Sequence, residues 1–178
     1  SSVATETVDV LQSTTDLERG VADAELIVVC TPVSDIVARV QQVTKHCPDR
    51  APITDVGSTK AVIVETLEAS LTRDISFVGS HPLAGSEKTG PEHAVPDLFH
   101  DRVTVVTPTA QTPRSSTETI LEFWSLLGSQ VLEMSPLEHD RVLAMTSHTT
   151  HVVASALAAA TAASELPLTA SGWQDTTR

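Results

Sequence analysis

Short apolar segments alternate along the chain with segments of helical periodicity, and this alternation restricts the fold more than any other feature. The run LIVVCTP at 26–32 is continuously apolar up to its proline, as in a strand buried on both faces. The following segment, 34–47, has four apolar residues at helical spacing. Further strands are expected at 51–58, 75–80, 102–108 and 130–135, and further helices at 59–71 and 115–127. This order predicts an α/β fold with a mainly parallel sheet.

Local signals predict where some of the helices begin and end. Thr15 with Glu18, and Ser115 with Glu118, have the spacing of a capping box at a helix start. Gly128 follows the helical pattern of 115–127 and is a natural residue just beyond a helix end.

Ligands of parallel sheets bind beyond the carboxyl ends of the strands. Three such ends carry chemically useful residues, at 31–32, 55–58 and 80–82. We expect these ends to lie near one another, and a ligand to bind there. Ser58, in the second of them, is also explained by a purely structural role as the N-cap of the next helix.

His81 stands at the third strand end, in the stretch FVGSHPLAG. Pro82 has no N–H donor and favours an extended conformation at His81. Gly79 and Gly85 allow the backbone to approach a ligand closely. A histidine held in this way could accept a hydrogen bond or act as a base near neutral pH, and the alternative is a solvent-exposed turn histidine.

The sequence changes character at Ser135. Residues 135–138 are typical of a helix start, with Ser135 as N-cap, Pro136 in the first turn and Glu138 at the third position. The segment 137–165 has the pattern of a single long helix, which predicts the entry to a second, helical domain.

A polar stripe is expected on this long helix, because four polar residues recur at helical multiples. The stripe could face a polar ligand, or it could contain core histidines bonded to the backbone. A metal site is disfavoured, because the histidine pair has i, i+3 spacing without the glutamate of a zinc motif. The four residues are Asp140, Ser147, His148 and His151.

Composition excludes several classes of partner. The formal net charge of −12 argues against a nucleic-acid or anionic-membrane surface. No apolar run approaches the ~20 residues that span a bilayer. Cys30, within an apolar run, is interpreted as a small buried hydrophobic residue, and Cys47 is the second cysteine. Two cysteines without a disulfide framework indicate the reducing cytoplasm.

Four segments together resemble one known family. They are ITDVGSTK at 53–60, FVGSHPLAGSEKTGPEHAVPDLFHDRVTVVTPT at 77–109, MSPLEHDRVLAMTSHTTHVVASAL at 134–157 and GWQDTTR at 172–178. Their order and spacing resemble the prephenate/arogenate dehydrogenase family over most of the chain. The resemblance implies that 1–135 is the C-terminal part of a Rossmann-type nucleotide-binding domain. It implies that 136–178 is the first part of an all-α dimerisation and substrate domain.

The resemblance also implies an activity. Such enzymes oxidise prephenate to 4-hydroxyphenylpyruvate, or arogenate to tyrosine, with release of CO2 and hydride transfer to NAD or NADP. The expected partners are therefore a small-molecule substrate and a second copy of the chain in a homodimer, within tyrosine biosynthesis.

Individual roles follow by matching position. His81 would bond the substrate's ring hydroxyl and help to take its proton, and Ser58 would sit between that hydroxyl and the nicotinamide. Arg178 would hold a substrate carboxylate. The remaining implied roles are substrate contacts at His151, His148, Ser147 and Gly172, cofactor contacts at Thr31, Pro32, Val56 and Ser58, and an orienting role for Asp140.

Some family features are missing from the sequence. It lacks the G-x-G-x-x-G fingerprint and the residue that selects NAD or NADP, so the chain is expected to be a fragment that begins after them. Gln174 stands where a lysine is common, which leaves prephenate and arogenate both open. One alternative is a catalytically disabled fragment that only binds or dimerises. Another is a β-hydroxyacid-type dehydrogenase, but the lysine expected on its long helix is absent from 137–165.

Overall fold

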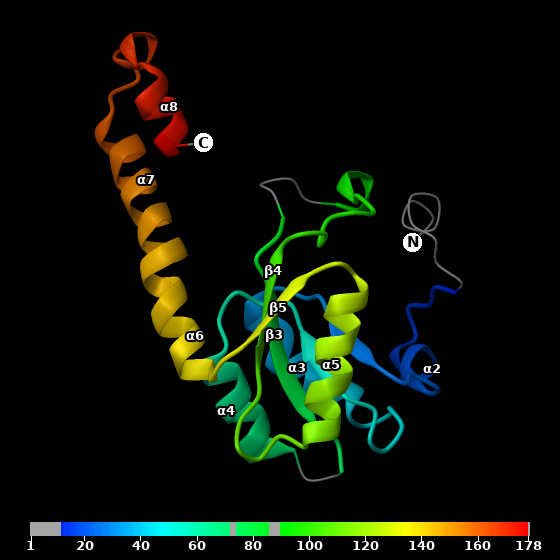
Figure 1. Cartoon of the computed structure of the whole chain (residues 1–178). Helices are drawn as coiled ribbons and strands as arrows, with labels where there is room; N and C mark the ends of the chain where they lie inside the picture. Colours follow the sequence, from blue (N-terminus) through cyan, green and yellow to red (C-terminus); the bar gives the residue numbers. More distant parts are fainter. Residues whose placement is uncertain (1–11, 72–73, 86–89, 178) are drawn as a thin grey trace. The chain divides into compact units, whose positions relative to one another are not determined.

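The computed structural model describes residues 12–71, 74–85 and 90–177 (Figure 1). The chain divides into two compact units, Ser1–His139 and Asp140–Arg178, which are described separately below. The main elements of the first unit are α2 (Leu17–Val21), β1 (Ile27–Val29), α3 (Ile36–Val43), β2 (Ile53–Asp55), α4 (Ala61–Ser70), β3 (Phe77–Pro82), β4 (Val103–Thr107), α5 (Arg114–Leu126) and β5 (Gln130–Glu133).

The five described strands form one sheet in the order β1-β2-β3-β4-β5. The pairs β1–β2, β2–β3 and β4–β5 are parallel, and β3–β4 is antiparallel. An α/β fold with a mainly parallel sheet is therefore confirmed. The register pairs Val29 with Asp55, so the carboxyl ends of β1 and β2 meet at one edge of the sheet.

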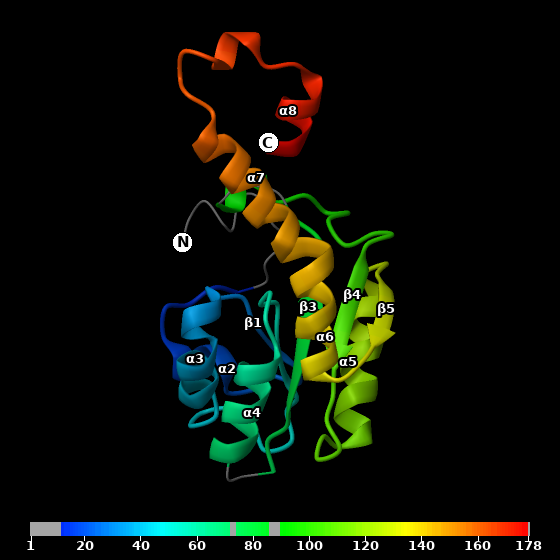
Figure 2. The ribbon, with the colours of Figure 1, turned by 90° about the vertical axis from the view of Figure 1, so that its left-hand side faces the viewer.

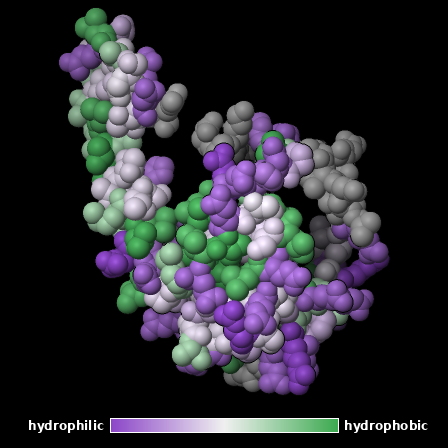
Figure 3. All heavy atoms as spheres, in the orientation of Figure 1, coloured by the Kyte–Doolittle hydropathy of each residue, from purple (hydrophilic) through white to green (hydrophobic). Residues whose placement is uncertain are grey.

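Helices cover both faces of the sheet, and each face has its own apolar core. Figure 1 shows α5 in front of the sheet, with α3 and α4 behind it. Neighbouring residues of a strand point to opposite faces, so Phe77 packs in the α3–α4 core and Val78 packs with Ile120 and Trp124 of α5. On the face seen in Figure 3, hydrophobic side chains gather near the centre of this unit, with polar ones around them.

Several helix ends differ from the expected ones. Asp16, not Thr15, caps α2, because its carboxylate accepts a hydrogen bond from the Arg19 backbone N–H. The helix α5 starts directly after Pro113, so the box expected at Ser115 is not used as the cap. Gly128 has φ +83° just beyond α5, as expected.

The environment of Cys30 was predicted incorrectly, and that of Gly79 has a feature not expected from the sequence. Cys30 is exposed, because β1 ends one residue earlier, at Val29. At Gly79, side chains of the protein itself occupy the space where a Cβ atom would lie. A Cβ atom there would lie 2.6 Å from Thr107 Oγ1 and 3.1 Å from Lys60 Cδ.

The second unit is built around the helix that starts with α6 (Pro136–Leu143), at the end of the first unit. A π-helical segment, Ala144–His148, continues into α7 (Thr149–Ala160), and α8 (Ser171–Thr177) follows. The helix therefore ends at Ala160, earlier than the 165 that was expected. Trp173 Nε1 of α8 donates to Thr161 Oγ1 at 2.9 Å, which fastens α8 to the end of α7; Figure 2 shows both helices. None of the described helices is both long and apolar enough to cross a membrane.

Candidate active site

The candidate site lies at the carboxyl ends of β1, β2 and β3. Thr31 and Pro32 follow β1, Ser58 follows β2, and His81 is the penultimate residue of β3. The backbone N–H of Ser80 donates to Asp55 Oδ1 at 3.1 Å, so the ends of β2 and β3 are joined directly. The expectation that these strand ends lie together is confirmed.

A buried ion pair shapes the loop that carries Ser58. Asp55 and Lys60 are both fully buried, and the Lys60 ammonium contacts Asp55 Oδ2. The same oxygen accepts a hydrogen bond from the Gly57 backbone N–H at 2.9 Å. The pair therefore ties together the two ends of the loop 56–60, and Ser58 is exposed between them.

Ser58 is not a helix cap in this structure. The N-cap position of α4 belongs to Lys60, whose side chain makes no capping hydrogen bond, and not to Ser58. The purely structural explanation of Ser58 is therefore wrong, and its exposed position leaves the hydroxyl available to a ligand.

The charge state of Asp55 reflects two opposing effects. Burial raises the pKa of the Asp55 carboxyl above its ordinary value. The Lys60 ammonium and the backbone N–H groups of Gly57 and Ser80 pull the pKa down, but do not fully cancel this rise. Lys60 is the largest of the influences that lower the pKa of Asp55, so loss of that partner would raise this pKa further.

Ser80 links the ion pair to the core beneath α5. Its hydroxyl donates to the backbone carbonyl of Asp55 at 2.6 Å and accepts from Trp124 Nε1 at 3.0 Å. Thr54 Oγ1 lies 2.8 Å from the same hydroxyl and also donates to the Val78 carbonyl. All these side chains are fully or nearly fully buried, so the residue before His81 is held by a rigid polar network.

His81 is half-buried and pairs with a second histidine. Its Nδ1 lies 2.9 Å from Nε2 of His139, and the rings meet edge to face at 69°. His139 is fully buried at the end of the first turn of α6. The expected helix start is confirmed here, since Ser135 Oγ accepts from the Glu138 N–H at 3.3 Å. His81 is therefore not a solvent-exposed turn histidine.

The hydroxyl of Thr31 is the clearest sign of a missing partner in the first unit. Its Oγ1 is buried and makes no hydrogen bond to any residue that the structure describes. Buried hydroxyls are nearly always hydrogen-bonded. Pro32 beside it is exposed and Val56 is half-buried, so a ligand at these strand ends would find one unsatisfied hydroxyl and an apolar surface.

The predicted residues of the second unit lie on its first helix and on α8. Ser147 and His148 are half-buried within the π-helical segment, and His151 is exposed on α7. Thr149 Oγ1, just beyond this segment, donates to the carbonyl of Ala144 at its start, five residues earlier. A π turn rotates the chain less per residue, so the single α-helical face expected for this stripe does not apply. Such segments are frequent at functional sites.

Three further predictions concern this unit. Asp140 is half-buried in α6, and Gly172 is exposed in α8. Arg178 lies outside the described residues. Among the described residues no three histidine, cysteine, aspartate or glutamate side chains are grouped as a metal site would require.

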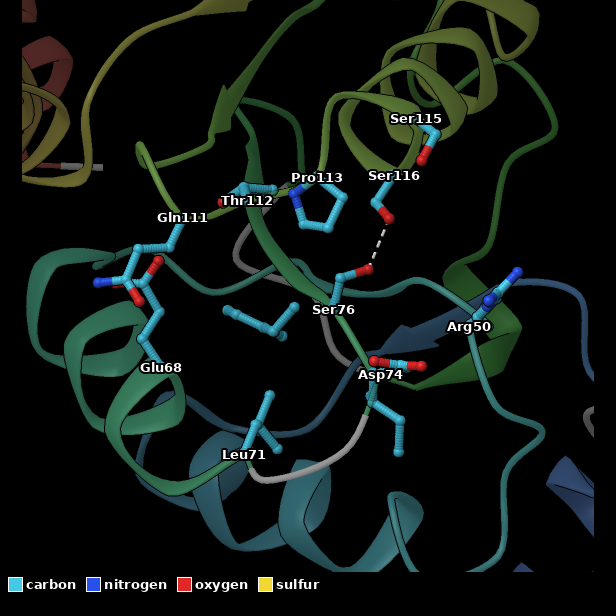
Figure 4. Close-up of a pocket in the computed structure, with 12 residues that line it drawn as sticks. Arg50, Glu68, Leu71, Asp74, Ser76, Gln111, Thr112, Pro113, Ser115 and Ser116 are labelled. Carbon is cyan, nitrogen blue, oxygen red and sulfur yellow. Dashed lines mark hydrogen bonds between the residues drawn. The ribbon is translucent and has the colours of Figure 1, made fainter.

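A large cavity lies at the opposite edge of the sheet. It has a volume of about 550 Å³ and opens at the amino end of β3, between Leu71 of the α4 end and the start of α5 (Figure 4). Ser76 and Ser116 in its wall are bonded to each other at 2.6 Å. Because ligands of parallel sheets bind at the carboxyl ends, this cavity is not the candidate site.

Four groups of this site give little or no functional signal in the sequence. Lys60 lies inside a helical pattern, and His139 stands between two charged residues at a helix start. Asp55 stands out only as a strand-end residue, although a carboxylate closing an apolar strand needs a buried partner. Ser80 likewise stands out only by its position at a strand end.

Sequence comparison connects this geometry with a family. Residues 1–133 match the sequence model described as "Prephenate dehydrogenase, nucleotide-binding domain", and 135–178 match "Prephenate dehydrogenase, dimerization domain". The chain belongs to the prephenate dehydrogenase family. The resemblance found in its four segments is thereby confirmed.

Individual relatives of the chain carry three related names. Cyclohexadienyl dehydrogenase of Zymomonas mobilis is 36% identical over 141 residues, which are 79% of this chain and 48% of that protein. The structure of Aquifex aeolicus prephenate dehydrogenase with hydroxyphenyl propionate and NAD+ has a TM-score of 0.85 and 29% identity, covering 98% of this chain and 64% of that one. Synechocystis arogenate dehydrogenase has a TM-score of 0.82 and 28% identity, covering 99% and 66%. The chain spans about half the length of the curated relatives that it matches.

Proposed function

We propose that this chain is part of an enzyme that oxidises prephenate, releases CO2 and transfers hydride to NAD or NADP, as a step of tyrosine biosynthesis. Family membership supports the reaction class. The observation that carries the proposal is His81, half-buried at a strand end and bonded through Nδ1 to a buried histidine. This bond occupies Nδ1, so proton exchange with a substrate must use Nε2.

The strand ends fit a nicotinamide dinucleotide. Thr31 offers a buried hydroxyl that no described residue satisfies, and Pro32 and Val56 offer apolar surface. These residues, with Ser58, would hold the cofactor near His81. When bound, the nicotinamide accepts the hydride. An NAD+ complex of a relative, the Aquifex enzyme, supports the same cofactor class for this chain.

In this reaction His81 would accept the proton that the substrate hydroxyl loses as the hydride is transferred. The C–H bond beside the ring hydroxyl breaks with its electron pair leaving as hydride, and the hydroxyl proton moves to Nε2 of His81. Loss of CO2 then supplies the electron pair that makes the ring aromatic, and the proton can return to the phenolate oxygen. Ser58, exposed in its loop, would donate or accept a hydrogen bond at the same hydroxyl.

The second domain would supply the substrate's anion contacts. We assign 1–135 to the nucleotide-binding domain and 136–178 to the helical dimerisation domain of a homodimer. Prephenate has two carboxylates and the chain carries a net charge of −12, so a placed cation is needed. Arg178 can grip a carboxylate with two parallel hydrogen bonds. His151, His148, Ser147 and Gly172 would line the same pocket, with Asp140 orienting them.

The test is an assay of the full-length protein with prephenate or arogenate and with NAD or NADP. We expect oxidation of at least one substrate, with 4-hydroxyphenylpyruvate or tyrosine as product by chromatography. His81→Ala should lower kcat by roughly 10²–10⁴-fold, as for loss of a catalytic base, while cofactor binding survives. Absence of turnover in all four combinations, or near-normal turnover in His81→Ala, would contradict the proposal.

A further inference from the structure

We propose that His139 is a positioning residue that fixes the tautomer of His81. This inference rests on the proposed role of His81 as the base. The 2.9 Å contact joins Nδ1 of His81 to Nε2 of His139, and His139 is fully buried. His139 is not among the site residues expected from the sequence.

Two nitrogens at this distance share one proton when both rings are neutral. In one arrangement His81 Nδ1–H donates and His139 Nε2 accepts, which leaves the lone pair of His81 at Nε2. In the other, His139 Nε2–H donates and the proton of His81 must sit on Nε2. Only the first arrangement allows His81 to take a proton from the substrate hydroxyl.

The first arrangement also suits the protonated intermediate. Once His81 has taken up the proton, both of its nitrogens carry hydrogen, so Nδ1–H must donate and His139 Nε2 must accept. His139 has to remain neutral at this step. Its full burial favours the neutral imidazole, because a charged ring loses its hydration when it is buried.

Both rings are attached to rigid backbone, as an orienting pair requires. His81 lies opposite Val105 in the β3–β4 ladder, and the next ladder bond, from Leu83 N–H to the Val103 carbonyl, is 2.8 Å long. His139 is anchored by its N–H, which donates to the Ser135 carbonyl at 2.9 Å. The contact therefore joins a strand end to a capped helix start within the first unit.

The tautomer can be measured without any substrate. Ring nitrogen chemical shifts in ¹⁵N-labelled protein distinguish Nδ1–H from Nε2–H, and His81→Ala assigns the signals of His81. We expect His81 to be the Nδ1–H tautomer in the unaltered chain. His139→Phe keeps a ring of similar size but removes the acceptor, so the His81 signals should shift toward Nε2–H. His139→Gln keeps an acceptor near the position of Nε2 and should retain Nδ1–H. His93→Gln, at a partly exposed histidine elsewhere, is the matched control and should change nothing at His81.

Turnover of the full-length protein provides the second readout. His139→Phe should lower kcat by ~10- to 100-fold, the size of effect known for loss of a group that orients a metal-bound histidine, with little change in KM. His139→Gln should restore most of the lost kcat.

The two readouts separate this inference from the proposed function. An Nε2–H tautomer in the unaltered chain, or His81 signals indifferent to His139→Phe, would overturn the inference even if the enzyme is active. An altered tautomer with unchanged kcat would leave the inference standing but would contradict the proposed role of His81 as the base. If no substrate is oxidised, the proposed function fails, and the tautomer measurement still decides whether His139 orients His81. If His139→Phe does not fold by circular dichroism, the tautomers of the unaltered chain and of His139→Gln decide between the two arrangements.

Discussion

Removing one member of the buried Asp55–Lys60 pair should damage the first unit more than removing both. Lys60→Met keeps the length of the side chain but deletes its charge, and Asp55→Asn deletes the opposite charge. Both residues are fully buried, so neither partner left behind can turn to water. The double variant Asp55→Asn with Lys60→Met removes both of these buried charges.

The sizes follow from the contacts. Breaking a buried ion pair by removing one partner costs about 3–5 kcal/mol, so each single variant should lose about that much of the free energy of unfolding. Asn at position 55 has only one oxygen, whereas Asp55 accepts backbone N–H groups on both oxygens, from Gly57 and Ser80. One N–H then stays unsatisfied in the double variant, at about 1–3 kcal/mol. The double variant should therefore be more stable than either single one.

Urea unfolding followed by Trp124 fluorescence measures these differences in the first unit. A Trp173→Phe background removes the only other tryptophan signal. The exposed pair Arg114–Glu118 provides the matched control, since its side chains are 66% and 62% exposed. Arg114→Met should cost less than about 1 kcal/mol. Single costs below about 1 kcal/mol that simply add in the double variant would refute the organising role of the buried pair.

The pH dependence has a definite sign. Burial raises the pKa of folded Asp55 above its value in the unfolded chain. Between these two pKa values the folded state binds more protons than the unfolded state, so stability falls as pH rises through this range. Lys60→Met removes the ammonium that lowers the folded-state pKa of Asp55, so the pH range in which stability falls extends to higher pH. The stability gap between Lys60→Met and the double variant should therefore narrow as pH falls. A gap that widens toward acid pH would contradict the assignment.

Three further outcomes are expected. Gly79→Ala should destabilise the first unit by about 1–3 kcal/mol in urea unfolding, because its Cβ would lie 2.6 Å from Thr107 Oγ1. The control Gly172→Ala, with nothing within 4 Å of the added Cβ, should change stability by less than about 1 kcal/mol. Trp124→Phe leaves the Ser80 hydroxyl without its donor and should cost about 1–3 kcal/mol by circular dichroism melting. Arg178→Ala in the full-length protein should mainly raise KM for the substrate, and an unchanged KM would count against a carboxylate contact.

The parts of the fold that repeat along the sequence were predictable, and the parts set by single side chains were not. Alternating apolar and helical segments predicted the sheet and the meeting of its strand ends. Helix starts depended on which of several adjacent polar side chains accepts a hydrogen bond from the first turn, so Asp16 caps α2 although Thr15 had the better sequence pattern. The π-helical segment could not be predicted, because the pattern of apolar and polar residues there fits an ordinary α-helix. In the structure, the bond from Thr149 Oγ1 to the Ala144 carbonyl spans this segment.

The candidate site divides in the same way. His81 and Ser58 could be found because they follow apolar strands, where ligands bind. His139 could not be found from its neighbours, because Glu138 and Asp140 on either side make the segment look like a solvated helix start. Its burial comes from contact with residues far away in the sequence, and His81 is 58 positions distant.

The buried polar groups of this unit are arranged to hold positions and not to maximise stability. An apolar pair in place of Asp55 and Lys60 could be equally stable, because desolvation offsets most of the attraction between buried charges. An apolar pair would not, however, bind the N–H groups of Gly57 and Ser80, which fix the loop bearing Ser58 and the residue before His81. The same reasoning applies to His139, whose buried ring gives His81 a directional partner that a leucine could not provide. Both arrangements act on the strand ends that carry the proposed site, so disturbing either should reduce turnover of the full-length protein.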